Sequence, residues 1–152
     1  MTHLRHYFVL DALKNNKIKN FKAKEIKTEV KFGDNTRFDF LITDSNSKKF
    51  IEVKNVTLSR TNKLAEFPDA VTSRGAKHID ELIKAKNKGY DIYLMFVIQR
   101  DDCDQFSIAR DIDPKYADLL SDAIKKKLNI LCYDCKFSPK GIKLNKQIKI
   151  KI

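Results

Sequence analysis

Apolar and polar positions along the 152-residue chain form short periodic blocks, and each block predicts a helix or a strand. Apolar residues at helical spacing predict a helix over 3–15. Alternation predicts strands over 25–32 (EIKTEVKF) and 37–42 (RFDFLI), and a polar turn separates the second from a third strand over 49–58. These short connections favour an antiparallel meander.

The second half of the chain alternates between helices and strands. A helix within 67–89 is predicted to begin at Thr72 or Ser73 and to end at Gly89, because these residues suit helix caps. A further helix is predicted over 113–127, with Asp113 as its cap and Pro114 at its first position. Strands are predicted over 91–100, 129–137 and the closing residues 141–152.

The resulting order is α-β-β-β-α-β-α-β-β, without repeats or low-complexity linkers. A meander followed by a β-α-β-α-β series predicts a mixed central sheet with helices on its faces, an α/β fold with α+β character. The length suits a single domain over residues 1–152.

Composition indicates a folded protein and gives no sign of a membrane segment. Hydrophobic residues make up 42% of the chain, and the longest apolar run, 92–98, is far shorter than the ~20 residues of a membrane helix. The N-terminus MTHLRHYFVL has no long apolar signal core, so a cytoplasmic location and no membrane partner are expected.

The three cysteines are odd in number, which favours a reducing compartment. Cys132 and Cys135 form a C-x2-C, the spacing of half a zinc or redox site. They lie in a predicted strand, where an offset of three places the thiols on opposite faces. The sequence therefore argues against a metal or redox role for the pair.

The chain is strongly basic, with a net charge of +11 from 25 Lys and 6 Arg against 20 acids. Such a balance suggests a polyanionic partner, most often a nucleic acid. A genome-wide bias in base composition can raise the lysine content of every encoded protein. The excess of positive charge therefore favours a DNA partner only modestly.

Charged residues interrupt two of the predicted apolar strands. Glu52 and Lys54 lie two apart in FIEVK and share a face. Asp39 stands between Phe38 and Phe40, which are expected to share the opposite face, and pairing of the two strands brings Asp39 within reach of Glu52. Two carboxylates and an ammonium are thus expected on one patch of sheet.

A divalent cation would compensate the two carboxylates. Asp39, Glu52 and the backbone carbonyl of Val53 supply oxygen ligands that suit Mg²⁺ or Mn²⁺. Beside such an ion, Lys54 could orient or deprotonate a water, a combination that suits phosphodiester hydrolysis. The competing interpretation is a salt-bridged sheet edge without a ligand.

The pattern D-x12-E-x-K resembles the core of the PD-(D/E)xK nuclease superfamily. RFDFLI, FIEVKNVTL, FPDAVTSRGAKHIDEL, FVIQRDD, IDPKYADLL and SPKGIKL resemble the C-terminal domain of the sugar fermentation stimulation protein A family over essentially the whole chain. This resemblance implies a restriction-endonuclease-like core in which Asp39, Glu52 and Lys54 are the catalytic residues. It also implies an accessory metal ligand at Asp11, where family members carry a Glu; Asp is shorter, and a solvated helix residue is the alternative.

The resemblance further implies DNA binding and a link to the regulation of sugar utilisation. Members usually carry an N-terminal β-barrel domain, which is expected to be absent from this chain. A second cluster, Thr72, Arg74, Lys77 and His78, lies at a helix start, where free N–H groups and basic side chains can bind a phosphate. Gln99 ends a buried strand and either approaches the same site or closes the strand.

Two function classes remain open. The first is a Mg²⁺- or Mn²⁺-dependent nuclease acting on DNA, and the second is a non-catalytic DNA-binding module in regulation. RNA or another phosphate substrate is a weaker third possibility. The presence of all three central residues favours the enzyme.

Overall fold

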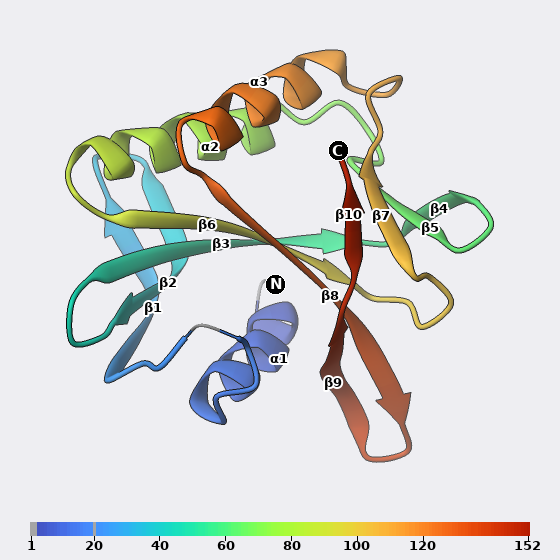
Figure 1. Cartoon of the computed structure of the whole chain (residues 1–152), viewed down its shortest axis with the longest axis horizontal. Coiled ribbons are helices and arrows are strands. Elements are labelled where there is room, and N and C mark those ends of the chain that lie inside the picture. The colour runs from blue at the N-terminus through green and yellow to red at the C-terminus, as the bar shows by residue number, and fades with distance from the viewer. Residues whose placement is uncertain (1–2, 20) are drawn as a thin grey trace.

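The computed structural model describes the backbone of residues 3–19 and 21–152 (Figure 1). Its elements, in chain order, are α1 (His3–Lys14), β1 (Glu25–Phe32), β2 (Thr36–Thr43), β3 (Lys48–Val56), β4 (Leu58–Thr61), β5 (Leu64–Phe67), α2 (Ser73–Asn87), β6 (Asp91–Ile98), β7 (Gln105–Ile108), α3 (Pro114–Lys125), β8 (Asn129–Ser138), β9 (Gly141–Gln147) and β10 (Lys149–Lys151).

The main sheet has six strands in the order β1-β2-β3-β6-β8-β9. Its central strands β3, β6 and β8 are parallel, and the outer pairs are antiparallel. Helices α2 and α3 make the two crossovers between the parallel strands and lie together on one side of the sheet, while α1 lies on the other (Figure 1). The predicted mixed sheet flanked by helices is confirmed.

The sheet separates two hydrophobic cores. The α2/α3 face contains Phe50 and Phe96 of the sheet packed with Leu82 and Leu120 of the two helices. The α1 face is the second core, in which the following residues pack together: Val9, Ala12 and Leu13 of α1, and Ile51 and Val53 of β3. Odd and even positions of β3 therefore belong to different cores, and Glu52 and Lys54 point toward the α2/α3 face.

A second, four-stranded sheet in the order β10-β7-β5-β4 was not predicted. The segment 49–58 was expected to be one strand, but β3 ends at Val56 and β4 begins at Leu58. The closing segment 141–152 likewise divides into β9 and β10. The four strands of this second sheet are three or four residues long, and β7 pairs in parallel with both β5 and β10. Such short, distant pairings leave no local periodic signal.

The helix starts agree with the predicted caps. Thr72 caps α2, its hydroxyl accepting a hydrogen bond from Gly75 N at 2.9 Å. Asp113 caps α3, accepting from Tyr116 N at 3.0 Å, and its second oxygen accepts from Thr72 N at 2.9 Å. The buried Asp113 thus ties the starts of both helices together, which fixes the first turns of α2 over the sheet.

Two smaller expectations concern the cysteines and membrane spans. Cys132 belongs to the core on the α2/α3 face and Cys135 to the core on the α1 face, so the predicted opposite orientation is confirmed. No helix within the described residues is long and apolar enough to cross a membrane.

Candidate active site

Strands β2 and β3 stop pairing where the predicted active-site residues begin. Their ladder ends with Phe40 opposite Ile51, and the next positions are Asp39 on β2 and Glu52 on β3. Beyond the ladder, Asp39 Oδ2 accepts a hydrogen bond from the backbone N–H of Val53 at 2.7 Å. The carboxylate therefore replaces the next strand-to-strand bond, and the two strands open around it.

The opening follows from a rotation of β2 at Asp39. Phe38 packs in the core on the α2/α3 face, whereas Phe40 packs in the core on the α1 face. Residues two apart on a regular strand share a face, so the expectation that these two rings lie together is wrong. On β1, Glu29 lies between the residues that pair with Phe40 and Phe38, and its φ of 51° is a left-handed conformation that marks the same irregularity.

The carbonyl of Val53 points into the same opening. The N–H and C=O of one strand residue project toward the same neighbour, and the N–H of Val53 points to Asp39. A carboxylate oxygen and a backbone oxygen thus border one gap at the end of the β2–β3 ladder. The role of Val53 as a metal ligand stays a prediction, and the direction of its carbonyl is compatible with that role.

Glu52, Lys54 and His78 form a compact buried cluster on the α2/α3 face. His78 Nδ1 lies 2.7 Å from Glu52 Oε2 and 2.6 Å from Lys54 Nζ, and the Lys54 ammonium lies 3.5 Å from the same carboxylate oxygen. The three side chains are only 5, 12 and 10% exposed, in the order Glu52, Lys54, His78. The first turns of α2 place His78 against β3, because His78 lies three residues beyond the buried Gly75 on the same helix face.

The surroundings of Lys54 disfavour its charged form. Burial lowers the pKa of the Lys54 ammonium, and the positive charge of Arg74 lowers it further. The carboxylates of Glu52 and Asp39 oppose this shift without cancelling it. Three charged groups from β2, β3 and α2 therefore act on one amine, which can exchange a proton more readily than an exposed lysine.

One oxygen of Glu52 has no hydrogen-bond partner among the described residues. Glu52 Oε1 is buried, and among the described residues no donor lies within hydrogen-bond distance of it. The Tyr116 hydroxyl is also buried without a partner in the described part of the chain. Burial raises the pKa of Tyr116, and the charge of Glu52 raises it further, so the phenol stays protonated beside the cluster. A buried carboxylate oxygen normally needs a donor or a cation.

The described residues contain no group of three or more His, Cys, Asp or Glu side chains placed to hold a metal. Mg²⁺ needs fewer protein ligands, because it keeps several waters and binds through one or two carboxylates plus substrate phosphate. Asp39, Glu52 and the carbonyl of Val53 fit that requirement.

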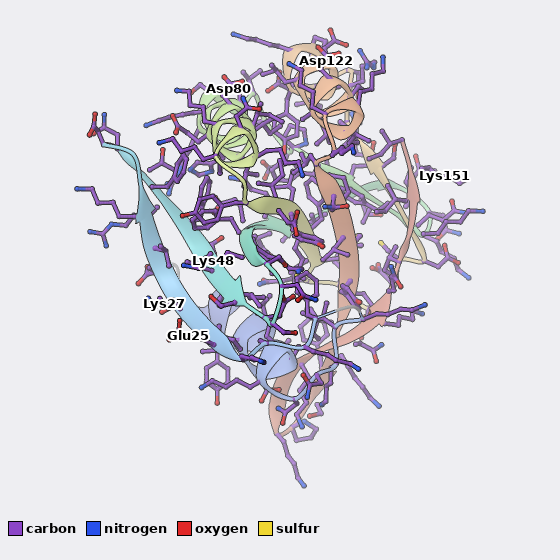
Figure 2. All side chains as sticks on the ribbon, turned by 60° about the vertical axis from the view of Figure 1, so that its left-hand side comes forward. Glu25, Lys27, Lys48, Asp80, Asp122 and Lys151 are labelled. Carbon is purple, nitrogen blue, oxygen red and sulfur yellow. The ribbon has the colours of Figure 1, made fainter. Side chains whose placement is uncertain are left out.

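A basic groove of about 550 Å³ lies beside the cluster, between the β1–β2 hairpin and α2. Figure 2 shows the hairpin running from Glu25 and Lys27 toward α2, the helix that carries Asp80. Lys77 Nζ contacts the carbonyl of Asn35 at 3.5 Å, across this groove. We call it the hairpin–α2 groove; it is lined by Lys31, Asp34, Asn35, Thr36 and Arg37 of the hairpin and by Arg74, Lys77 and His78 of α2.

The remaining predicted residues are less closely tied to the cluster. Helix α1 packs on the opposite face of the sheet, and the described contacts of the Asp11 carboxylate include the side-chain amide of Asn15 at 3.1 Å. The groups of Thr72 are used in the α2 cap, and Gln99 closes β6 by donating its N–H to Val56 O at 2.9 Å. Metal binding by Asp11 and phosphate binding by Thr72 stay predictions.

Sequence reasoning missed Tyr116, Lys31 and Arg37. Tyr116 follows the α3 cap in a regular helical pattern, so its position under Gly75 and near Glu52 gives no local signal. Lys31 and Arg37 match the pattern of an exposed strand, and only the β1–β2 register shows that they stand directly opposite each other.

Comparison with known proteins gives consistent matches. Residues 3–141 match the family model "Sugar fermentation stimulation protein RE domain". The "Sugar fermentation stimulation protein homolog" of Pelagibacter ubique is 48% identical over 98% of this chain, and that of Ruegeria sp. is 44% identical over 88%. The solved structure of Pyrococcus furiosus SfsA in complex with Ca2+ is similar over 99% of this chain, with a TM-score of 0.90 and 27% identity.

These relatives are longer than the chain. It spans 65% of the Pelagibacter protein, 58% of the Ruegeria protein and 65% of the Pyrococcus chain. What the whole proteins bind or do therefore applies to this chain only as a proposal.

Proposed function

Since the chain belongs to the sugar fermentation stimulation protein family, we propose that it is a DNA-binding, metal-dependent phosphodiesterase with its site at Asp39, Glu52 and Lys54. The observation that carries the proposal is the buried Oε1 of Glu52, for which the described residues offer no hydrogen-bond partner. In the sequence of β3, Glu52 comes directly after the last residue that pairs with β2 and directly before Val53, whose N–H binds Asp39.

The donor set supports Mg²⁺ or Mn²⁺ as the ion. Both are hard cations that prefer carboxylate, carbonyl and water oxygens. The Ca2+ in the Pyrococcus relative is a cation of the same oxygen-seeking class. When bound, such an ion would polarise the phosphate and activate a water.

The chain's own residues would supply the rest of the chemistry. The N–H of Val53 fixes the Asp39 carboxylate, and His78 holds both Glu52 and Lys54 in place. Because burial lowers the pKa of Lys54, this amine can accept a proton from the attacking water. Arg74, whose charge already acts on Lys54, would hold the scissile phosphate.

The alternative is a non-catalytic DNA-binding module in the regulation of sugar utilisation. One observation favours it: Lys54 and His78 both contact Glu52 Oε2, so part of the carboxylate charge is already balanced within the protein. In that case the cluster would be a structural ion pair, and the basic groove alone would serve the function.

A plasmid assay separates the two. Supercoiled DNA is incubated with the protein and Mg²⁺ or Mn²⁺, and we expect nicking that EDTA, Glu52→Gln and Lys54→Met abolish. The control for Glu52 is Glu66→Gln, because the Glu66 side chain is only 11% exposed and is paired with Arg60. The control for Lys54 is Lys49→Ala, because Lys49 lies on β3 as well and its side chain is 11% exposed. Nicking that persists in Glu52→Gln, or no nicking by the wild type with either ion, refutes the enzyme.

A further inference from the structure

The hairpin–α2 groove concentrates positive charge next to the proposed catalytic cluster. Four cations line it, Lys31, Arg37, Arg74 and Lys77, against one acid, Asp34. Among the described residues, none of the four cations forms an ion pair with a carboxylate. Other arginines of the chain do: Arg60 binds Glu66 and Asp111, Arg100 binds Asp102, and Arg110 binds Asp118.

The pairing of β1 with β2 makes this concentration of positive charge destabilising for the fold. Lys31 and Arg37 are directly opposite each other in the β1–β2 ladder. Like charges at directly paired positions of an antiparallel sheet repel and destabilise it. Arg74 and Lys77 are three residues apart on α2, where side chains are also neighbours. Two like-charge pairs thus face the same groove, and a bound anion would relieve the repulsion of both.

The groove leads to the reacting groups. His78 lines it and contacts both Glu52 and Lys54, and Arg74 lines it and influences the pKa of Lys54. Its far wall is the β1–β2 hairpin, which the Lys77–Asn35 contact holds against α2. An extended polyanion in the groove would therefore pass from the hairpin to the cluster along a line of cations.

We propose that the hairpin–α2 groove binds the phosphodiester backbone of DNA on one side of the cleavage site, with Lys31 and Arg37 as the phosphate contacts of the hairpin wall. This inference rests on the proposed function for the identity of the polymer. It adds the β1–β2 hairpin as a binding element and sets the side of the cluster from which the backbone enters.

The test measures binding of a fluorescein-labelled 20-mer, as duplex and as single strand, by anisotropy in EDTA, so that no metal or cleavage is needed. Lys31→Ala/Arg37→Ala is compared with Lys27→Ala/Lys48→Ala, which removes the same charge from exposed lysines outside the groove (Figure 2). Each phosphate contact contributes about 0.9 log unit at 0.1 M salt on duplex DNA, so the groove variant should bind roughly 60-fold more weakly. Its salt slope should fall by about 1.8, and the control should stay within about threefold of the wild type.

The outcomes separate this inference from the proposed function. Equal losses in the groove variant and the control, or no loss on either DNA form, overturn the groove. A selective loss in the groove variant supports it even if the wild type does not nick plasmid, in which case the catalytic proposal fails alone. Nicking by the wild type with unchanged DNA binding by the groove variant leaves the catalytic proposal standing and removes the groove. Thermal unfolding confirms that each variant is folded.

Discussion

Reversal of the charge at Lys31 should stabilise the fold while weakening DNA binding. In the β1–β2 ladder Lys31 faces Arg37, so Lys31→Glu turns a like-charge pair into an attractive one. Cross-strand charge pairs are each worth about 0.2–1 kcal/mol, and the change removes one repulsion and adds one attraction. The expected gain in the free energy of unfolding is about 1 kcal/mol at low salt.

That gain can be measured as a melting shift. For a chain of 152 residues, 1 kcal/mol corresponds to about 3 °C in Tm, which calorimetry resolves easily. Both side chains are exposed, so the gain should shrink as NaCl rises from about 0.05 to 0.5 M, because salt screens surface pairs.

Lys27→Glu is the matched control. It makes the same change in net charge on the same strand, but Lys27 faces Leu41 and lies 3.9 Å from Glu25, so reversal replaces an attraction with a repulsion. We expect no rise in Tm for this variant. If Lys27→Glu raises Tm as much as Lys31→Glu does, the effect comes from the net charge of +11, and the reasoning about the opposed pair is wrong.

Three further predictions concern packing, thiols and pH. Gly75→Ala should destabilise the protein by about 1–3 kcal/mol in denaturant unfolding, although alanine favours helices, because the new Cβ would lie 3.0 Å from Tyr116 Cε1; an unchanged or higher midpoint would contradict this. Burial raises the pKa of the Cys135 thiol to about 11, so iodoacetamide at pH 8 should leave it unmodified in the native protein and modify it in urea, as read by mass spectrometry; fast native labelling would refute the buried placement. Because the folded state lowers the pKa of Lys54, the unfolded chain binds more protons below the normal lysine pKa of about 10.4, and wild-type stability should rise relative to Lys54→Met as pH approaches that value; a pH-independent difference would count against the shift.

The periodic parts of the fold were predictable from sequence because their signals are local. The strand over 25–32 has the predicted limits, and the caps Thr72 and Asp113 occupy the predicted positions. β5, with the sequence LAEF, has neither length nor alternation, and it forms a strand because β4 and β7 lie beside it. Pairing of that kind depends on the assembled chain.

The candidate site also has parts that local sequence patterns predict and parts that depend on the assembled fold. Strand parity was enough to place Glu52 and Lys54 on one face, since β3 is regular there. Parity failed at Asp39, because β2 rotates between Phe38 and Phe40, and the carboxylate bonds to the backbone of Val53 as a result. The position of Tyr116 beside Glu52 depends on how α3 packs against α2, and no local sequence pattern encodes that packing.

The central claim is that Asp39 and Glu52 hold a divalent cation, and a calorimetric titration of the full chain with Mn²⁺ tests it most directly. We expect the wild type to bind Mn²⁺, Glu52→Gln and Asp39→Asn to lose that binding, and Glu66→Gln to retain it. Binding by Glu52→Gln with the affinity of the wild type, or no binding by the wild type at millimolar Mn²⁺, would contradict the claim.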